Sequence, residues 1–263
     1  MSARVIALLS GKGGVGRTLL TASLGARLAK ENRRVALMDL NTGMRGLDMA
    51  LGLESRVAFD LGDVLDGVCE LKQALVRGPG GLRLLAARQM RDTEELDEDA
   101  LSRVMDALRA QFDWVLIDAA GGVGRGFTAA ANLGCEAVAV TTPDDASLRC
   151  VERAAGLWQR LGGEPPMLCV NRICPALVEE GLQYAPQTCS QVIDLYLLGV
   201  VPEDPQALRA ALSKAPLEGD SPAARGVKNL LARLENPKQK LWDWSPAPPP
   251  QADRPFLWKR RKA

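Results

Sequence analysis

The sequence Arg4-Val5-Ile6-Ala7-Leu8-Leu9-Ser10-Gly11-Lys12-Gly13-Gly14-Val15-Gly16-Arg17-Thr18 decides how this chain folds. Its first seven residues form an apolar run of strand length, and its glycine-rich part leads into residues 19–30, which suit a helix. Glycines let a backbone wrap closely around a phosphate, while the N–H groups of the loop and of the helix N-terminus supply donors and partial positive charge. The stretch therefore predicts a strand, a phosphate-binding loop and a helix in succession.

The spacing of this loop fits two phosphate-binding patterns. Read as G-x-G-x-x-G, with Asp39 about 20 residues beyond it, the loop satisfies the dinucleotide-binding fingerprint. Read as G-x-x-x-x-G-K-[ST], residues 11–18 match a P-loop, except that Arg17 stands at the lysine position. The loop alone does not decide between the two.

Three features favour the P-loop. Lys12 adds a cation beside the phosphates, Thr18 offers a hydroxyl to Mg²⁺, and a second apolar run ends in Asp118, which could hold the water shell of the metal. The glycine-rich residues 119–124 follow and could swing toward a γ-phosphate. Taken alone, this second loop could be an ordinary turn between a strand and a helix, but beside the first loop that interpretation is the weaker one.

Seven short apolar runs predict the strands of one sheet. Most end in Gly, Pro, Asp or Asn, and stretches of helical length such as residues 98–111 and 146–161 lie between them. Because the runs are continuous rather than alternating, they predict an α/β fold with a mostly parallel, doubly wound sheet of about seven strands covered by helices. Such sheets bind ligands beyond the carboxyl ends of their strands. The runs are residues 4–10, 34–39, 82–86, 114–118, 136–142, 166–171 and 196–202.

The amino-acid composition excludes several kinds of catalytic and metal site. The 263 residues include no histidine, and the six cysteines form no C-x-x-C pair, so His-dependent triads and His-ligated metals are excluded and zinc ribbons lose their support. Five of the 33 basic residues lie in residues 254–263, so the rest of the chain has 28 basic against 32 acidic residues. A broadly basic body is thus absent, and no specific nucleic acid is expected as a partner.

The sequence shows neither a signal peptide nor an apolar run of membrane-spanning length, which predicts a cytoplasmic protein.

The composition changes after Glu235. Residues 1–235 are expected to form the globular domain, and the proline-rich residues 236–253 a stiff, extended linker. Residues 254–263 combine Phe256, Leu257 and Trp258 with basic side chains, which favours docking on an anionic membrane surface. A solvated end and a contact with nucleic acid are the alternatives for this tail.

Residues 11–18, with the early Lys12, resemble the deviant Walker A motif of the ParA/MinD ATPases. Residues 39–48 are similar to the first switch segment of that family, and residues 142–145, 170–172 and 199–204 resemble further family segments in the same order. Within the family the chain most resembles the septum-site-determining members. The resemblance implies a P-loop ATPase that hydrolyses ATP to ADP and phosphate, dimerises with ATP, binds the inner face of the cell membrane reversibly and helps to position the division septum.

The resemblance also implies a set of functional residues. Lys12 is expected to reach the phosphates of the partner across a dimer, and Asn171 to read adenine, although an Asn at a strand end also caps turns. The implied cofactors are ATP and Mg²⁺, and the implied partners are a second copy, an anionic membrane, and division-inhibitor and regulator proteins of the Min system. The expected catalytic residues are Lys12, Asp39 and Asn41, the expected metal ligands are Thr18, Asp39 and Asp118, and the expected nucleotide-binding residues are Gly11, Lys12, Gly13, Gly14, Val15, Gly16, Arg17, Thr18, Asn171 and Pro202.

Two residues depart from the family pattern. Arg17 replaces the compact P-loop lysine with a planar guanidinium. Asn41 stands where the family has the Asp that positions the attacking water, and an amide lacks useful basicity. We therefore expect slow hydrolysis, with binding less affected. A hydrolysis-impaired nucleotide-dependent scaffold, a ParA-like DNA- or cargo-positioning ATPase and an NAD-dependent enzyme stay open as alternatives.

Overall fold

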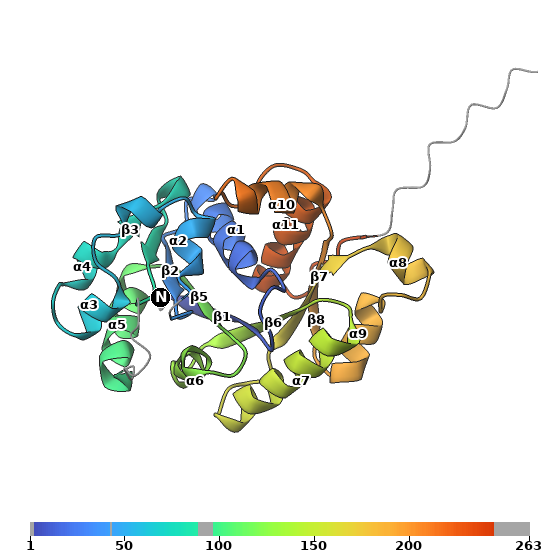
Figure 1. The fold of residues 1–263 in the computed structure, drawn as a ribbon, viewed down its shortest axis with the longest axis horizontal. Coiled ribbons are helices and arrows are strands. Elements are labelled where there is room, and N and C mark those ends of the chain that lie inside the picture. Colours follow the sequence, from blue (N-terminus) through green and yellow to red (C-terminus); the bar gives the residue numbers. More distant parts are fainter. Residues whose placement is uncertain (1–2, 43, 89–96, 245–263) are drawn as a thin grey trace, which may run out of the picture.

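The computed structural model describes residues 3–42, 44–88 and 97–244. In this part of the chain one sheet of eight strands runs through the molecule in the order β3-β4-β2-β5-β1-β6-β7-β8 (Figure 1). The strands are β1 (Arg4–Ser10), β2 (Val35–Asp39), β3 (Val76–Arg77), β4 (Arg83–Leu85), β5 (Trp114–Gly121), β6 (Glu136–Thr141), β7 (Met167–Ile173) and β8 (Leu197–Pro202).

All strand pairs are parallel except the one between β3 and β4. The mostly parallel, doubly wound sheet predicted from the sequence is thereby confirmed, with eight strands in place of about seven. The additional strand is β3, which has two residues and lies at the edge of the sheet. It is too short for its residues to form a recognisable apolar run, so only its pairing with β4 identifies it.

Helices cover both faces of the sheet (Figure 1). One face carries α1, α2 and α11, and the other carries α3, α5, α6, α7 and α9. The helices are α1 (Arg17–Lys30), α2 (Gly46–Ala50), α3 (Leu61–Leu65), α4 (Leu71–Ala74), α5 (Glu98–Gln111), α6 (Arg125–Asn132), α7 (Asp145–Arg160), α8 (Pro175–Glu179), α9 (Pro186–Ile193), α10 (Pro205–Leu212) and α11 (Pro222–Glu235). Two 3₁₀ turns are η1 (Glu54–Arg56) and η2 (Pro79–Gly81).

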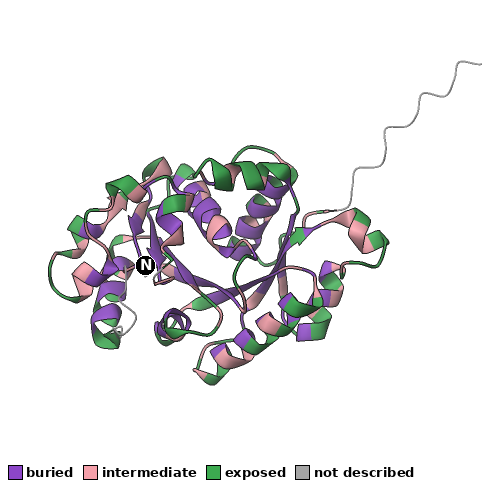
Figure 2. Ribbon diagram, in the orientation of Figure 1, coloured by how far each residue is buried: buried purple, intermediate pink, exposed green. Residues whose placement is uncertain are grey.

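The central strand β1 explains why its sequence is apolar throughout. Ala7 and Leu9 pack into the core beneath α5, α6 and α7, whereas Ile6 and Leu8 pack into the core beneath α1 and α11. A strand buried on both faces needs apolar side chains at consecutive positions. Figure 2 shows the sheet as a buried layer between half-exposed helices.

The two helices predicted at residues 98–111 and 146–161 form where expected. α5 spans the predicted residues 98–111, and α7 begins and ends one residue earlier than predicted. Each begins after an aspartate whose side chain accepts a hydrogen bond from a backbone N–H of the first turn, Asp97 from Ala100 and Asp144 from Ser147. Such N-caps satisfy donors that have no partner within the helix, and each contributes about 1 kcal/mol.

The segment after α11 returns along that helix. Arg233 donates hydrogen bonds to the carbonyl of Gln239 and to the Tyr196 hydroxyl, and the side chain of Asn229 donates to the carbonyl of Lys240. The described beginning of the predicted linker, residues 236–244, is therefore held against the body. The predicted tail, residues 254–263, lies outside the described residues. Among the residues that the structure describes, no helix has the length and apolar character needed to cross a membrane.

Candidate phosphate and nucleotide site

The glycine-rich loop joins β1 to α1 at the carboxyl edge of the sheet, where parallel α/β sheets bind ligands. Two glycines are required there by close contacts. A Cβ at Gly11 would lie 2.0 Å from the carbonyl oxygen of Cys150 on α7, and a Cβ at Gly16 would lie 2.3 Å from the Asn171 amide nitrogen. Gly16 also has a φ of +91°, which side chains other than glycine rarely adopt. The loop is thus held between α7 and β7 at the start of α1.

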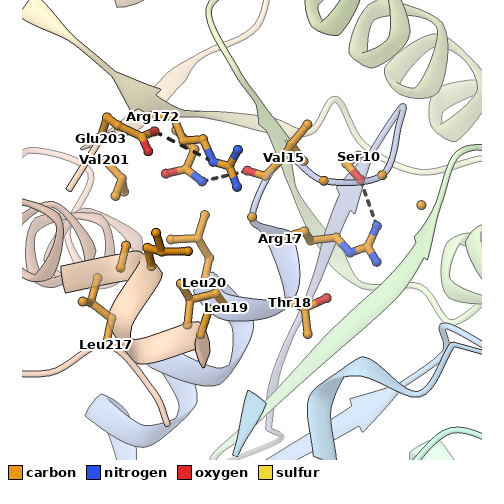
Figure 3. Close-up of a pocket in the computed structure, with 18 of the residues that line it drawn as sticks. Ser10, Val15, Arg17, Thr18, Leu19, Leu20, Arg172, Val201, Glu203 and Leu217 are labelled. Atoms are coloured by element: carbon orange, nitrogen blue, oxygen red, sulfur yellow. Dashed lines mark hydrogen bonds and ion pairs between the residues drawn. The ribbon is translucent and has the colours of Figure 1, made fainter. Parts of the chain in front are cut away.

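Arg17 does not extend freely into the loop. Its side chain is only 6% exposed, its Nε lies 2.5 Å from Oδ1 of Asp118, and its Nη1 donates to the Ser10 hydroxyl at 2.8 Å. Figure 3 shows the guanidinium reaching toward Ser10. Arg17, which the sequence predicts to bind phosphate, is therefore paired with the buried carboxylate of Asp118 on β5.

Asp39 and Asp118 are register partners on the neighbouring strands β2 and β5, and both are fully buried. Asp39 accepts backbone hydrogen bonds from Asn41 at 2.8 Å and from Leu47 at 3.0 Å. Burial, followed by the charge of Asp118, raises the pKa of Asp39 to about 7. Asp39 thus holds the two ends of the predicted switch segment, and its role as a metal ligand stays a prediction.

The residues around Thr18 fit a magnesium ion. The Thr18 hydroxyl donates to Oδ2 of Asp118 at 2.7 Å, which places a hydroxyl oxygen beside two buried carboxylates. Mg²⁺ prefers oxygen ligands, and together with phosphates it is bound through one or two carboxylates. Thr18 and Asp118 would therefore hold Mg²⁺, with Asp39 adding negative charge beside them. Asn41, the predicted water-positioning residue, lines the same cavity.

Lys12 lies on the other side of the loop, with its Nζ 3.6 Å from Oδ1 of Asp144. Its side chain is 38% exposed. Burial raises the pKa of Asp144, but hydrogen bonds from Thr142 and Ser147, with the charge of Lys12, outweigh it and bring this pKa down to about 2. Lys12 and Asp144 both line a second hollow of about 490 Å³ that adjoins the loop.

The loop opens into a cavity of about 620 Å³. This volume lies within the range of about 300–1,000 Å³ that is usual for small-molecule sites. In Figure 3, Arg17 and Thr18 lie at one end of the cavity, Val201 and Leu217 lie at the other, and Leu20 lies between them. A polar end made of loop backbone and an apolar end made of leucine and valine suit a phosphorylated molecule with a flat apolar part, such as a nucleotide.

Asn171 lines this cavity beside the glycine-rich loop. Its side-chain amide donates to the carbonyl of Val15 at 2.7 Å, so one of its N–H groups supports the loop. The carboxamide keeps further hydrogen-bonding capacity, and both Asn171 and Pro202 line the cavity as the sequence predicts. Whether Asn171 also reads a base stays a prediction.

All the predicted loop residues except Gly11 line this cavity. Gly11 instead lies against the backbone of α7. Sequence reasoning missed the contribution of α10 and the turn after it, from which Ala207, Leu208, Ala211 and Leu217 line the apolar end. A helix predicted directly after β8 could have indicated them, because it must begin at the carboxyl edge of the sheet.

Comparison with known proteins places these features in a family. The family model described as "Cellulose biosynthesis protein BcsQ" matches residues 3–232. The septum site-determining protein MinD of Helicobacter pylori is 34% identical over 240 residues, which cover 88% of this chain and 90% of that protein. The MinD protein of Bacillus subtilis is 35% identical over 235 residues, which cover 87% of this chain and 88% of that protein.

Solved structures agree with these sequence matches. The chain is similar to the MinC:MinD cell division protein complex of Aquifex aeolicus, with a TM-score of 0.85 and 31% identity over 93% of this chain and all of that chain. It is also similar to the septum site-determining protein MinD of Pyrococcus horikoshii complexed with Mg-ADP, with a TM-score of 0.78 and 27% identity over 89% of this chain and 96% of that chain.

Proposed function

This chain belongs to the ParA/MinD family of P-loop ATPases, and we propose that it is a cell-division ATPase that dimerises with ATP, docks on the inner face of the cell membrane and helps to position the division septum. The relatives support a MinD-like P-loop ATPase that uses a nucleotide and Mg²⁺.

The observation that carries the proposal is the loop of residues 11–18 at the mouth of a cavity with a polar and an apolar end. Loop N–H groups and the start of α1 would bind phosphates, and Thr18 with Asp118 would hold Mg²⁺, which supplies positive charge to the phosphates when bound. Asn41 lines the cavity from the switch segment, where its amide can orient water but cannot accept a proton. These parts support ATP binding with slow hydrolysis.

Lys12 supports the dimerisation step. Its ion pair with Asp144 is long and exposed, and such pairs contribute about 0–1 kcal/mol, so the ammonium can leave Asp144 at little cost. The loops at the same edge of the sheet expose apolar side chains, Met44 in the switch segment and Val123 after β5. A partly exposed lysine and exposed apolar side chains in loops at the same edge of the sheet suit a surface that a second copy covers, with each Lys12 reaching the nucleotide of its partner.

The tail supports membrane docking by its composition. Burying one large apolar side chain contributes about 1.5–3 kcal/mol, and each basic residue near an anionic surface contributes about 1 kcal/mol, before the cost of ordering. One tail of residues 254–263 is therefore a marginal anchor. Two tails on one dimer bind much more strongly through their effective concentration. Dimerisation with ATP would thus recruit the protein, and hydrolysis would release it.

Co-sedimentation with vesicles tests the proposal. We expect vesicles containing anionic lipid to bind the full chain more strongly with ATP than with ADP. Deleting residues 254–263 should abolish binding to vesicles and leave ATP binding intact. Lys12→Ala should also weaken vesicle binding, because monomers carry a single tail. Vesicle binding that is independent of the nucleotide and survives Lys12→Ala would contradict the proposal, as would ATP-dependent binding to DNA in place of vesicles.

A further inference from the structure

Arg17 and Thr18 each donate a hydrogen bond to one oxygen of the Asp118 carboxylate. The guanidinium uses Nε toward Oδ1 of Asp118 and Nη1 toward the hydroxyl of Ser10, while the hydroxyl of Thr18 occupies Oδ2 of Asp118. Both carboxylate oxygens therefore already have partners inside the protein. A carboxylate oxygen can accept a second partner, but a metal ion or its water shell at Oδ1 would meet the positive charge of the guanidinium in direct contact.

The contact between Arg17 and Asp118 matters because it places a positive charge beside buried carboxylates. Asp118 is completely buried and lies beside Asp39, which is also completely buried. Taking ionised carboxylates out of water costs several kcal/mol each unless a cation compensates them. The Arg17 guanidinium, itself 6% exposed, supplies one such positive charge in direct contact. A bound Mg²⁺ would supply positive charge to the same carboxylate, so the two cations neutralise the same group.

A lysine would act differently at this position. Its ammonium is a compact point charge, whereas the planar guanidinium presents donors in a fixed fork and can bind two acceptors at once. The side chain of Arg17 uses this fork to bridge β1, through Ser10, and β5, through Asp118. With a lysine, one oxygen of Asp118 would be released more readily for the water shell of a metal.

We propose that Arg17 and Mg²⁺ compete for Asp118, so that Arg17 weakens the coupling between nucleotide binding and Mg²⁺ binding in this protein. This inference rests on the proposed function, because it concerns the same phosphate site. Mg²⁺ would still bind with the nucleotide, but at Asp118 it would meet a carboxylate that the guanidinium already neutralises. Arg17 thus reduces the increase in nucleotide affinity that Mg²⁺ produces.

Calorimetric titration with ADP, in Mg²⁺ and in EDTA, tests the coupling on the full chain. The measured quantity is the factor by which Mg²⁺ raises the affinity for ADP. We expect this factor to be about tenfold larger in Arg17→Lys than in the natural sequence, within the range usual for coupled sites. Arg233→Lys makes the same chemical change at another buried arginine, whose described partners are carbonyls and the Tyr196 hydroxyl, and should leave the factor unchanged. Equal factors in Arg17→Lys and the natural sequence would overturn the inference.

Thermal melting without any nucleotide provides a second, independent readout. Arg17→Met leaves Asp118 and Asp39 without the guanidinium, so Mg²⁺ should raise the melting temperature of this variant by about 2–4 °C or more, and that of the natural sequence by less. The same shift in both proteins, or none in Arg17→Met, would overturn the inference. If ADP binds none of the proteins under any condition, the proposed function is wrong, whereas the melting experiment still decides whether Arg17 and Mg²⁺ compete.

Discussion

The side-chain amide of Asn171 donates a hydrogen bond to the backbone carbonyl of Val15 at 2.7 Å. This contact joins the end of β7 to the phosphate loop across 156 positions of sequence. Because the amide is buried and lies in the cavity wall, one residue both supports the loop and lines the cavity.

Asn171→Ala removes the hydrogen bond to Val15 and leaves a buried carbonyl without its partner. An unsatisfied buried acceptor costs about 1–3 kcal/mol, so the loop should lose its binding geometry and the affinity for ATP should fall about tenfold. Titration of ATP against the natural and variant chains measures this. An affinity that does not change would contradict the role given to Asn171. A larger loss for ATP than for GTP would additionally support base reading.

Gly16→Val should abolish ATP binding in Mg²⁺. The added side chain would begin 2.3 Å from the Asn171 amide nitrogen, at a φ of +91° that valine does not tolerate. Gly156→Ala on α7, where the nearest atom to an added Cβ lies at 3.5 Å, is the matched control and should bind ATP normally. The natural chain should bind ATP and not NAD. NAD binding without ATP binding would show that the loop is a dinucleotide site.

Arg17→Lys combined with Asn41→Asp should raise the rate of ATP hydrolysis above that of the natural sequence. The first change frees Asp118 from the guanidinium, and the second places a carboxylate in the switch segment beside the cavity. Phosphate release at saturating ATP measures the rate, and each single variant serves as a control for the other. A double variant that binds ATP but hydrolyses it no faster would show that these two residues do not limit hydrolysis.

Trp258→Ala should weaken binding to anionic vesicles at every salt concentration, because it removes apolar surface that the bilayer interface buries. Raising the salt concentration should mainly remove the part contributed by the basic residues of the tail, since the Debye length is about 8 Å at physiological ionic strength. Vesicle co-sedimentation over a salt series separates the two. A Trp258→Ala effect that vanishes at high salt would assign the whole binding to charge.

Asp144→Asn should lower thermal stability at neutral pH, and the difference from the natural sequence should shrink in acid. The pKa of Asp144 is lowered to about 2, below the ordinary value of about 3.9 in the unfolded chain. Its contribution is therefore fully present above about pH 4 and is lost as the pH falls toward 2. Melting temperatures at about pH 6 and about pH 2.5 measure this. Asp106→Asn, on the exposed side of α5, is the control, and a difference that persists in acid would contradict the prediction.

Local patterns in the sequence determined most of the fold. The run from Arg4 to Ser10 could be recognised as a strand, because a strand buried on both faces must be apolar at consecutive positions. The phosphate loop could be recognised because its glycines follow one another at fixed spacing. By contrast, β3 is defined only by its antiparallel pairing with β4, and no local pattern contains that information.

The sequence by itself also determined which residues form the phosphate loop and that Asp39 ends β2, whereas β5 continues past Asp118 to Gly121. Only the tertiary structure decided what Arg17 does, because Asp118 lies 101 positions away and is brought to the loop by the pairing of β1 with β5. It likewise decided that Leu208 and Leu217 form the apolar end of the cavity. A motif specifies residues that are neighbours in the chain, whereas the partner of a buried charge depends on which strands lie side by side.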